Sequence, residues 1–284
     1  MSVQSVAVLG AGTMGHGIAH VSAVAGYQVT LYDLSVDAAA RGLASIRANM
    51  DKGVERGKLD AADRDAALAR IRPMTSLQDA VQGADLVIEA VPEKLSIKRQ
   101  LFASIEPFIG PDTILGTNTS SLSVGAIATA VQRPERVIGL HFFNPVHIMK
   151  LLEIIVPSST SEQTLDRCRV YGEAIGKQCI TVKDFPGFAT SRLGVCLGME
   201  AIRMVEQGVA SPEDIDSAMV LGYRHPIGPL KLTDLVGLDV RMHIGEYLAQ
   251  ELGNAAFEPP ALMRKMVGQG RLGKKSGRGF YDWS

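Results

Sequence analysis

A glycine-rich turn near the start of the chain constrains the fold more than any other feature of the sequence. Residues 10–15 have the pattern G-x-G-x-x-G and stand between an apolar run, 5–10, and a helix-forming run, 16–25. In such a turn glycine permits a tight bend, the close approach of a pyrophosphate and close helix–strand packing, and the helix N-terminus favours phosphate. The pattern predicts a dinucleotide site made by Gly10, Ala11, Gly12, Thr13, Met14 and Gly15. A glycine-rich turn that binds nothing is the alternative.

An acidic residue at the end of the next apolar run makes this interpretation more specific. Asp33 follows Gly12 by 21 residues. A carboxylate there accepts hydrogen bonds from the ribose hydroxyls of the dinucleotide and repels a 2′-phosphate. Leu34 and Ser35, which come next, offer no arginine for such a phosphate. The pattern therefore favours NAD over NADP.

Short β-branched runs alternate with helical segments in the first two thirds of the chain. Strands that alternate with helices indicate a mostly parallel sheet covered on both faces, which is an α/β fold of the Rossmann type. The runs span residues 5–10, 28–33, 84–91, 113–118, 136–143, 151–156 and 179–182.

A helical excursion interrupts this alternation between Leu34 and Pro73. Apolar residues recur there at helical spacing, and charged residues occupy the other faces. The apolar positions are Leu43, Ile46, Met50 and Val54, and the charged ones are Asp51, Lys52, Glu55, Arg56 and Lys58. A plain dinucleotide-binding fold does not need this insertion.

Strand signals end after residue 183, and helical patterns continue to the end of the chain. Residues 188–207 predict one long helix, Ser211 and Pro212 predict the start of another, and residues 229–252 and 259–268 continue the pattern. We therefore expect two domains: an NAD-binding Rossmann-like domain at 1–183 and an all-helical domain at 184–284. The first long helix has little polar surface, which favours a subunit interface and hence a homodimer over a wholly internal helix.

Composition excludes several classes of protein. The 284 residues suit about two domains, and a net charge of −1 gives no basic field for nucleic acid. The three cysteines form no CxxC pair, and no two histidines have the spacing of metal ligands, so we expect neither disulfides nor a metal site. The first apolar run is too short for a membrane span and lacks the flanks of a signal peptide, so cytoplasmic localisation is the expectation.

A histidine and a glutamate on neighbouring apolar runs form the candidate catalytic pair. His141 ends one run, where ligands bind in sheets of this kind. Glu153 interrupts the next run, and a carboxylate in so apolar a strand needs a partner. Paired with His141, Glu153 would fix the imidazole tautomer and offset its charge when protonated. A purely structural pair fits the spacing equally well.

The polar segment 117–121 follows another predicted strand and so lies at the same edge of the sheet. Its short side chains could bind a substrate oxygen or the nicotinamide, although a turn with helix-capping serines explains the pattern as well.

Motifs along the whole chain resemble those of the NAD-dependent (S)-3-hydroxyacyl-CoA dehydrogenases, in particular the short-chain 3-hydroxybutyryl-CoA type. They occur in the family's order and cover essentially all of the sequence. The motifs are GAGTMGHGIA (10–19), VIEAVPEKLSIK (87–98), TNTSSL (117–122), GLHFFNPVHIMKLLEII (139–155), DFPGFATSRL (184–193), GPLKLTDLVGLD (228–239) and GKKSGRGFYDW (273–283).

The resemblance implies a role for individual residues. His141 matches the family's general base, Glu153 its partner, and Ser120 the serine beside the nicotinamide that binds the substrate oxygen. Cofactor contacts are implied for the turn 10–15 and for Asp33, Glu93, Lys98, Ser120, Asn144 and Lys275. Coenzyme A contacts are implied for Ser120, Asn49 and Arg56, and Lys52 adds positive charge to the same helix face. Asn49 and Arg56 replace the family's more usual Ser and Lys, and a solvated helix face is the simpler explanation without the resemblance.

One departure from the family concerns the reacting oxygen. Much of the family has an asparagine before the Arg-Leu pair that follows the DxPGF segment, whereas this chain has Ser191. A hydroxyl can still donate one hydrogen bond, so Ser191 stays a candidate with weaker polarising ability. The remaining histidines, His16, His20, His147, His225 and His243, are expected to be structural.

The implied reaction is the reversible oxidation of an acyl-CoA alcohol, (S)-3-hydroxyacyl-CoA, to 3-ketoacyl-CoA with NAD. The substrate partner is thus an acyl-CoA, with no nucleic acid and no membrane involved. Two alternatives remain: a dehydrogenase of a free hydroxy acid or sugar acid on the same scaffold, and a dinucleotide-binding protein with a structural or sensing role.

Overall fold

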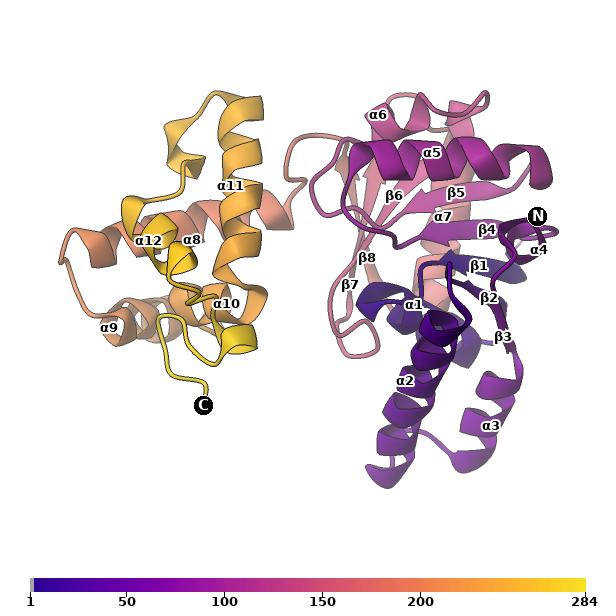
Figure 1. Cartoon of the computed structure of the whole chain (residues 1–284), viewed down its shortest axis with the longest axis horizontal. Helices are drawn as coiled ribbons and strands as arrows, with labels where there is room; N and C mark the ends of the chain where they lie inside the picture. Colours follow the sequence, from indigo (N-terminus) through magenta and orange to yellow (C-terminus); the bar gives the residue numbers. More distant parts are fainter. Residues whose placement is uncertain (1–2) are drawn as a thin grey trace. The chain divides into compact units, whose positions relative to one another are not determined.

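The computed structural model describes residues 3–284, which form two compact units. The first unit, Met1–Asp184, contains a sheet with helices, and the second, Phe185–Ser284, is helical (Figure 1). Among residues 3–284, no helix is both long enough and apolar enough to cross a membrane.

The first unit is built on one eight-stranded sheet with the order β3-β2-β1-β4-β5-β6-β7-β8. Of its seven strand pairs, β6–β7 is antiparallel and the others are parallel. The first six strands follow the order of a dinucleotide-binding fold, in which ligands bind where the order reverses, beside β1 and β4. The predicted Rossmann-type sheet is confirmed. The strands are β1 (Ser5–Leu9), β2 (Gln28–Tyr32), β3 (Ile71–Met74), β4 (Leu86–Glu89), β5 (Ile114–Thr117), β6 (Val137–Phe142), β7 (Leu151–Val156) and β8 (Gln178–Lys183).

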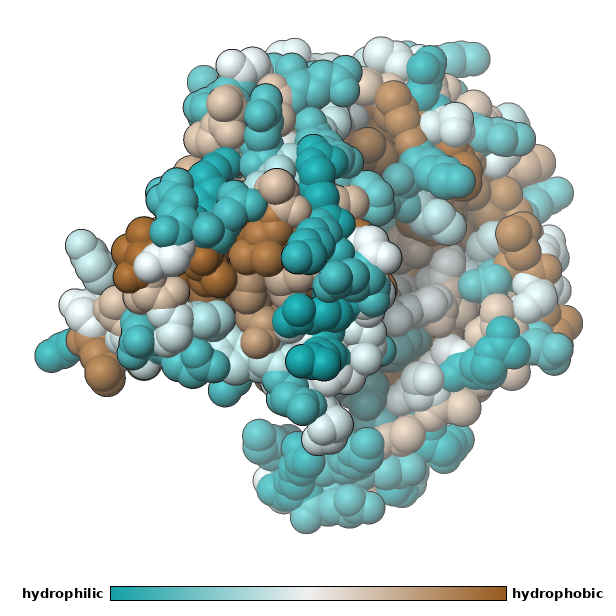
Figure 2. Space-filling view, turned by 60° about the vertical axis from the view of Figure 1, so that its left-hand side comes forward, coloured by the Kyte–Doolittle hydropathy of each residue, from teal (hydrophilic) through white to brown (hydrophobic). Residues whose placement is uncertain are grey.

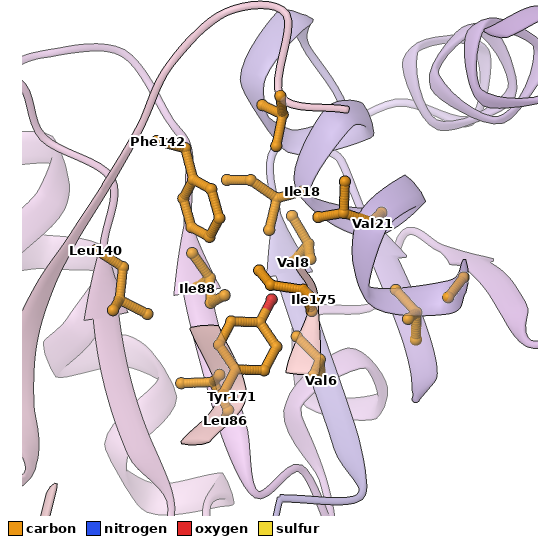
Figure 3. Packing of buried hydrophobic residues seen from close by; sticks show 14 of the residues in the cluster. Val6, Val8, Ile18, Val21, Leu86, Ile88, Leu140, Phe142, Tyr171 and Ile175 are labelled. Atoms are coloured by element: carbon orange, nitrogen blue, oxygen red, sulfur yellow. The ribbon is translucent and has the colours of Figure 1, made fainter. Parts of the chain in front are cut away.

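Helices cover both faces of this sheet. Because the strand order reverses at β1, right-handed crossovers place α1 (Thr13–Val24) and α5 (Leu95–Ile105) on opposite faces. The face under α1 is also covered by α7 (Glu162–Ala174), and Figure 3 shows Ile18 of α1 and Tyr171 of α7 packed over β1 and β4. The Tyr171 hydroxyl and Ser22 Oγ are hydrogen-bonded at 2.7 Å, so each of these buried hydroxyls has a partner in the core. Shorter elements are α4 (Leu77–Val81), α6 (Val124–Ala128), η1 (Glu106–Phe108) and η2 (Pro134–Arg136).

The helical excursion forms two helices, α2 (Val36–Glu55) and α3 (Ala61–Ala69). Ser35 caps α2 by accepting a hydrogen bond from the Ala38 amide at 3.0 Å. The outer ends of both helices are covered mainly by hydrophilic side chains, at the bottom of Figure 2.

The helical excursion was predicted between Leu34 and Pro73 with no strand in it, and this is wrong at its end, because Ile71–Met74 forms strand β3. This strand has four residues and contains a proline, and both features weaken a strand signal. It lies at the edge of the sheet, where proline costs no internal hydrogen bond.

The second unit is all-helical, as predicted. Ser211 caps α9 by accepting from the Asp214 amide at 3.1 Å, and Pro212 is its first residue. The helical stretch 229–252 is two helices, because Gly237 adopts φ 107° between them, a conformation that favours glycine. The elements are α8 (Thr190–Glu206), α9 (Pro212–Ser217), η3 (Ala218–Gly222), α10 (Pro229–Val236), α11 (Leu238–Leu252), η4 (Ala255–Phe257), α12 (Ala261–Gly268) and η5 (Lys274–Ser276).

Large hydrophobic side chains are exposed on the second unit, which comes forward in Figure 2 and shows brown surface there. Leu193 on α8 is 72% exposed, and Leu221 and Tyr223 beside α9 are 81% and 76% exposed.

Candidate active site

The glycine-rich turn lies at the reversal point of the sheet, with little room beyond its backbone. Gly10 has φ 105°, and a Cβ atom there would come within 2.8 Å of the Ala90 carbonyl oxygen. A Cβ at Gly15 would lie 1.6 Å from the Gly10 carbonyl oxygen, whereas a Cβ at Gly12 would meet nothing within 4 Å. Gly10 and Gly15 therefore shape the turn, and Gly12 leaves the open side on which a ligand can approach it.

Asp33 is held directly against this turn. Its Oδ2 accepts a hydrogen bond from the Ala11 amide at 2.9 Å, so β2 and the turn after β1 are joined by the predicted acid. The next residue, Leu34, is 88% exposed and brings no positive charge. The surroundings fit a dinucleotide, since an open Gly12 lies beside a carboxylate suited to ribose hydroxyls.

His141 and Glu153 face each other across the antiparallel strands β6 and β7, as residues directly paired in the register. His141 Nδ1 lies 2.6 Å from Glu153 Oε2, and the two side chains are 8% and 0% exposed. An ionised carboxylate can only accept, so Nδ1 donates, and in the neutral ring Nε2 is then the nitrogen that can take a proton. The pair can therefore act as a general base.

The polar segment after β5 is organised by Glu93. Its Oε1 accepts hydrogen bonds from Thr119 Oγ1 at 2.6 Å, from the Ser120 amide at 2.8 Å and from Ser120 Oγ at 3.2 Å. Burial alone would raise the pKa of Glu93, but the charge of Lys98 and these hydrogen bonds outweigh it and lower the pKa. The resulting stabilisation is present above the ordinary pKa of this carboxyl and is lost as the pH falls.

Lys98 connects Glu93 to a second carboxylate that sequence reasoning missed. The Lys98 side chain is fully buried, and its Nζ lies 2.8 Å from Glu89 Oε1 and 3.2 Å from Glu93 Oε2. Glu89, also fully buried, further accepts from Thr117 Oγ1 and from the Val91 amide. The available signal was a glutamate inside the apolar run 84–91, the same signal that singled out Glu153. Lys98 thus holds the loop that carries Ser120, and a contact of Lys98 with the cofactor stays a prediction.

Replacing Lys98 by methionine should lower the free energy of unfolding by about 3 kcal/mol, because it leaves the fully buried Glu89 carboxylate without its ammonium partner. Urea unfolding measures this loss. The double variant E89Q/K98M, which also removes the Glu89 charge, should regain most of the lost stability, because Glu93 keeps its hydrogen bonds from Thr119 and Ser120. If the double variant is less stable than K98M, the ion pair is not what stabilises this loop.

Asn118 ties the same loop to the strand of the candidate base. Its Oδ1 accepts a hydrogen bond from the Phe142 amide at 2.9 Å, next to His141. The motif 117–121 was predicted to lie at this edge of the sheet, but the bond to β6 depends on strands brought together by the fold.

Three of the residues expected to contact coenzyme A line one cavity of about 370 Å³ in the first unit, whereas the fourth, Ser120, is not among its lining residues. Asn49, Lys52 and Arg56 contribute the α2 side of it, and Thr13 and Asn144 lie on the other walls. The cavity is thus continuous with the glycine-rich turn, of which Thr13 is part.

Two further candidates belong to the second unit. Ser191 lies in the first turn of α8, and Lys275 in η5 forms an ion pair with Asp239 at 2.6 Å. Their roles remain predictions. Among residues 3–284, no group of three or more His, Cys, Asp or Glu side chains is arranged to hold a metal ion.

Comparisons with known proteins agree along the whole chain. Residues 5–185 match the family described as 3-hydroxyacyl-CoA dehydrogenase, NAD binding domain, and residues 187–283 match 3-hydroxyacyl-CoA dehydrogenase, C-terminal domain. A probable 3-hydroxybutyryl-CoA dehydrogenase of Bacillus subtilis is 44% identical over 283 residues, covering 100% of this chain and 98% of that protein. Two solved structures, Mycobacterium tuberculosis FadB2 and the (S)-3-hydroxybutyryl-CoA dehydrogenase PaaH1 from Ralstonia eutropha, have TM-scores of 0.97 and 0.96. Each is 41% identical to this chain, and each alignment covers 100% of this chain and 100% of the solved one.

Proposed function

We propose a specific reaction for this chain, which belongs to the 3-hydroxyacyl-CoA dehydrogenase family: the reversible oxidation of short-chain (S)-3-hydroxyacyl-CoA, such as 3-hydroxybutyryl-CoA, by NAD. The observation that carries the proposal is the buried His141–Glu153 pair at 2.6 Å, on the sheet that also carries the dinucleotide turn. Short acyl chains are supported by the names of the relatives from B. subtilis and R. eutropha.

The cofactor would be held by the turn 10–15 and by Asp33. NAD, when bound, supplies the acceptor for the hydride that leaves carbon 3 of the substrate. The turn offers backbone N–H groups to the pyrophosphate, and Asp33 offers its carboxylate to the ribose. The absence of a cationic residue at Leu34 and Ser35 supports NAD over NADP.

His141 would remove the proton of the substrate hydroxyl as the hydride leaves. The O–H electron pair then forms the second C–O bond of the ketone, and the proton stays on His141 Nε2 until it passes to solvent. Glu153 offsets the positive charge that appears on the imidazole and holds the ring in the reactive tautomer. In the reverse direction the same imidazole returns the proton to the oxygen.

Ser120 would position the substrate oxygen by turning its single hydroxyl hydrogen from Glu93 to that oxygen, while its backbone amide stays bound to Glu93. Ser191 would supply a second hydroxyl to the same oxygen. These donors matter because charge develops on this oxygen during reaction, and a missing donor typically costs about a hundredfold to a thousandfold in rate.

The carrier would bind through the cavity lined by Asn49, Lys52 and Arg56. Replacing both cations, in the variant K52A/R56A, should raise the KM for acetoacetyl-CoA about tenfold, the effect of two exposed ion pairs. The KM for NADH should stay unchanged, since the substitutions lie on α2 and outside the turn 10–15. Steady-state kinetics with both substrates measures the two values, and an unaltered KM for acetoacetyl-CoA would exclude this carrier site.

A direct assay tests the function as a whole. NADH oxidation is followed with acetoacetyl-CoA, with longer 3-ketoacyl-CoA substrates and with free acetoacetate side by side. We expect turnover of the CoA thioesters, fastest with the four-carbon chain. Turnover of the free acid alone would favour a hydroxy-acid dehydrogenase on the same scaffold. Binding of NADH without turnover of any of these substrates would favour a sensing role.

We further propose that the exposed hydrophobic face of the second unit forms a homodimer.

A further inference from the structure

Two histidines that sequence reasoning left as structural line the proposed carrier cavity. His16 of α1 and His147 after β6 lie on its walls together with Lys52 and Arg56 of α2. We propose that His16 and His147 are further carrier-binding residues: their protonated imidazoles bind a phosphate group of the substrate's nucleotide carrier, so that carrier binding takes up protons. This inference rests on the proposed acyl-CoA function. It adds His16 and His147 to the carrier site, and the family resemblance implied a carrier contact for neither.

The His16 ring is oriented so that protonation creates a new hydrogen-bond donor. His16 Nδ1 lies 2.8 Å from the Gly12 carbonyl oxygen, which can only accept, so Nδ1 carries a hydrogen. In the neutral ring Nε2 is then an acceptor and repels the oxygens of a phosphate. When Nε2 gains a proton it becomes a charged donor, the kind of group that binds phosphate strongly.

His147 is held by a stacked neighbour. Its ring lies 5.1 Å from that of His20 with an interplanar angle of 12°. His20 is buried, and its Nδ1 has no hydrogen-bond partner within the part of the chain that the structure describes. Burial, together with the charges of His147, His16 and Lys177, lowers the pKa of His20 to about 4. His20 therefore stays neutral at physiological pH and serves as a flat support for His147.

The charged groups around these rings are cationic. On α2 the cavity is lined by Lys52 and Arg56, and no Asp or Glu occurs among its lining residues within 3–284. Partial burial and then the charges of His16 and Lys177 lower the pKa of His147, so the unliganded site resists protonation. Lys177 itself donates to the Val146 and Met149 carbonyl oxygens.

The acid that precedes Lys52 on the cavity-lining helix is paired with a side chain of another helix. Asp51 of α2 forms an ion pair with Arg64 of α3 at 3.0 Å, so it does not neutralise the site. A bound phosphate would supply the missing negative charge and would accept a hydrogen bond from each protonated imidazole. By linkage, affinity for the carrier is then high at low pH and falls as the pH rises through the imidazole range.

The test uses the double variant H16Q/H147Q, which removes both titrating rings and keeps polar side chains of similar size. At pH 6 we expect the KM for acetoacetyl-CoA to rise about tenfold. Each histidine–phosphate pair that is lost contributes a factor of about three, and the two factors multiply. The ratio of the variant's KM to that of the wild type should fall towards one by about pH 8.5, where the wild-type imidazoles are neutral. Comparing the two proteins at each pH removes the contribution of the phosphate's own titration near pH 6.

Acetoacetyl-pantetheine, which lacks the nucleotide and its phosphates, is the substrate control. Wild type and H16Q/H147Q should turn it over with equal kcat/KM at every pH, which also shows that the variant is folded. The matched protein control is the variant His243→Gln. His243 is an exposed histidine on α11, and we expect its replacement to leave the kinetics on both substrates unchanged. Equal KM values for acetoacetyl-CoA at pH 6, or equal losses on both thioesters, would overturn the assignment. Absence of turnover of either thioester by the wild type would instead refute the proposed function.

Discussion

Replacing His141 by glutamine should lower kcat for acetoacetyl-CoA reduction by about a thousandfold, within the range that general acid–base catalysis contributes. Glutamine keeps a polar side chain of similar length but cannot take up or release the proton. The KM for NADH should change little, because the substitution leaves the turn 10–15 and Asp33, the residues proposed to hold the cofactor, unaltered. Stopped-flow measurement of the hydride-transfer step separates this effect from product release.

The partner residue provides the comparison. Glu153→Gln keeps a hydrogen-bond acceptor for the imidazole but removes the charge, so we expect a loss of kcat of about a hundredfold or more. The double variant H141Q/E153Q should be no slower than H141Q alone, because the two residues act as one unit. Wild-type turnover by H141Q would remove the mechanism, and multiplicative losses in the double variant would show that the two residues act separately.

The second large effect is expected in the glycine-rich turn, where two alanine substitutions should have different consequences. Gly15→Ala should lower the thermal midpoint and abolish binding of NADH, because its Cβ would lie 1.6 Å from the Gly10 carbonyl oxygen and the turn must shift. Gly12→Ala should keep the wild-type thermal midpoint, since its Cβ would meet nothing within 4 Å, yet should raise the KM for NADH about a hundredfold by blocking the pyrophosphate. Thermal unfolding and NADH titration measure the two properties.

The contrast between the two variants is the informative result. If Gly12→Ala binds NADH as tightly as the wild type does, the open side of the turn does not face the cofactor. If Gly15→Ala keeps its thermal midpoint, the backbone relaxes more readily than the packing of α1 on β1 indicates.

Local pattern was sufficient to predict the features of this chain that depend on neighbouring residues. The turn 10–15, the acid at Asp33 and the cap at Ser211 each have a fixed spacing from the element that they serve. The structure places the turn between β1 and α1, Asp33 directly after β2 and Ser211 at the start of α9, and the roles of the turn and of Asp33 in binding stay proposals. Strand β3 was missed because four residues with a proline at a sheet edge give almost no periodic signal.

Features that depend on the third dimension were harder to predict. The burial of Glu89 beside Lys98 requires β4 and α5 to pack together, although its place in an apolar run was a usable signal. Nothing in the sequence brings His16 near His147, since these residues are 131 positions apart and line one cavity only in the folded chain. The geometry of His141 and Glu153 agrees with the pairing inferred from their strands, while their role in catalysis stays a proposal.

The direct register of His141 with Glu153 makes the proton-transfer geometry independent of the residues proposed to select the carrier. The ladder between β6 and β7 fixes the distance between these residues, and the connecting segment 143–150 does not take part in it. That segment carries Asn144 and His147 on the wall of the cavity proposed to bind the carrier. Substitutions and small changes of length there can alter which carrier is accepted while the proton-transfer geometry is preserved, so variation in this one loop offers a route to new substrates.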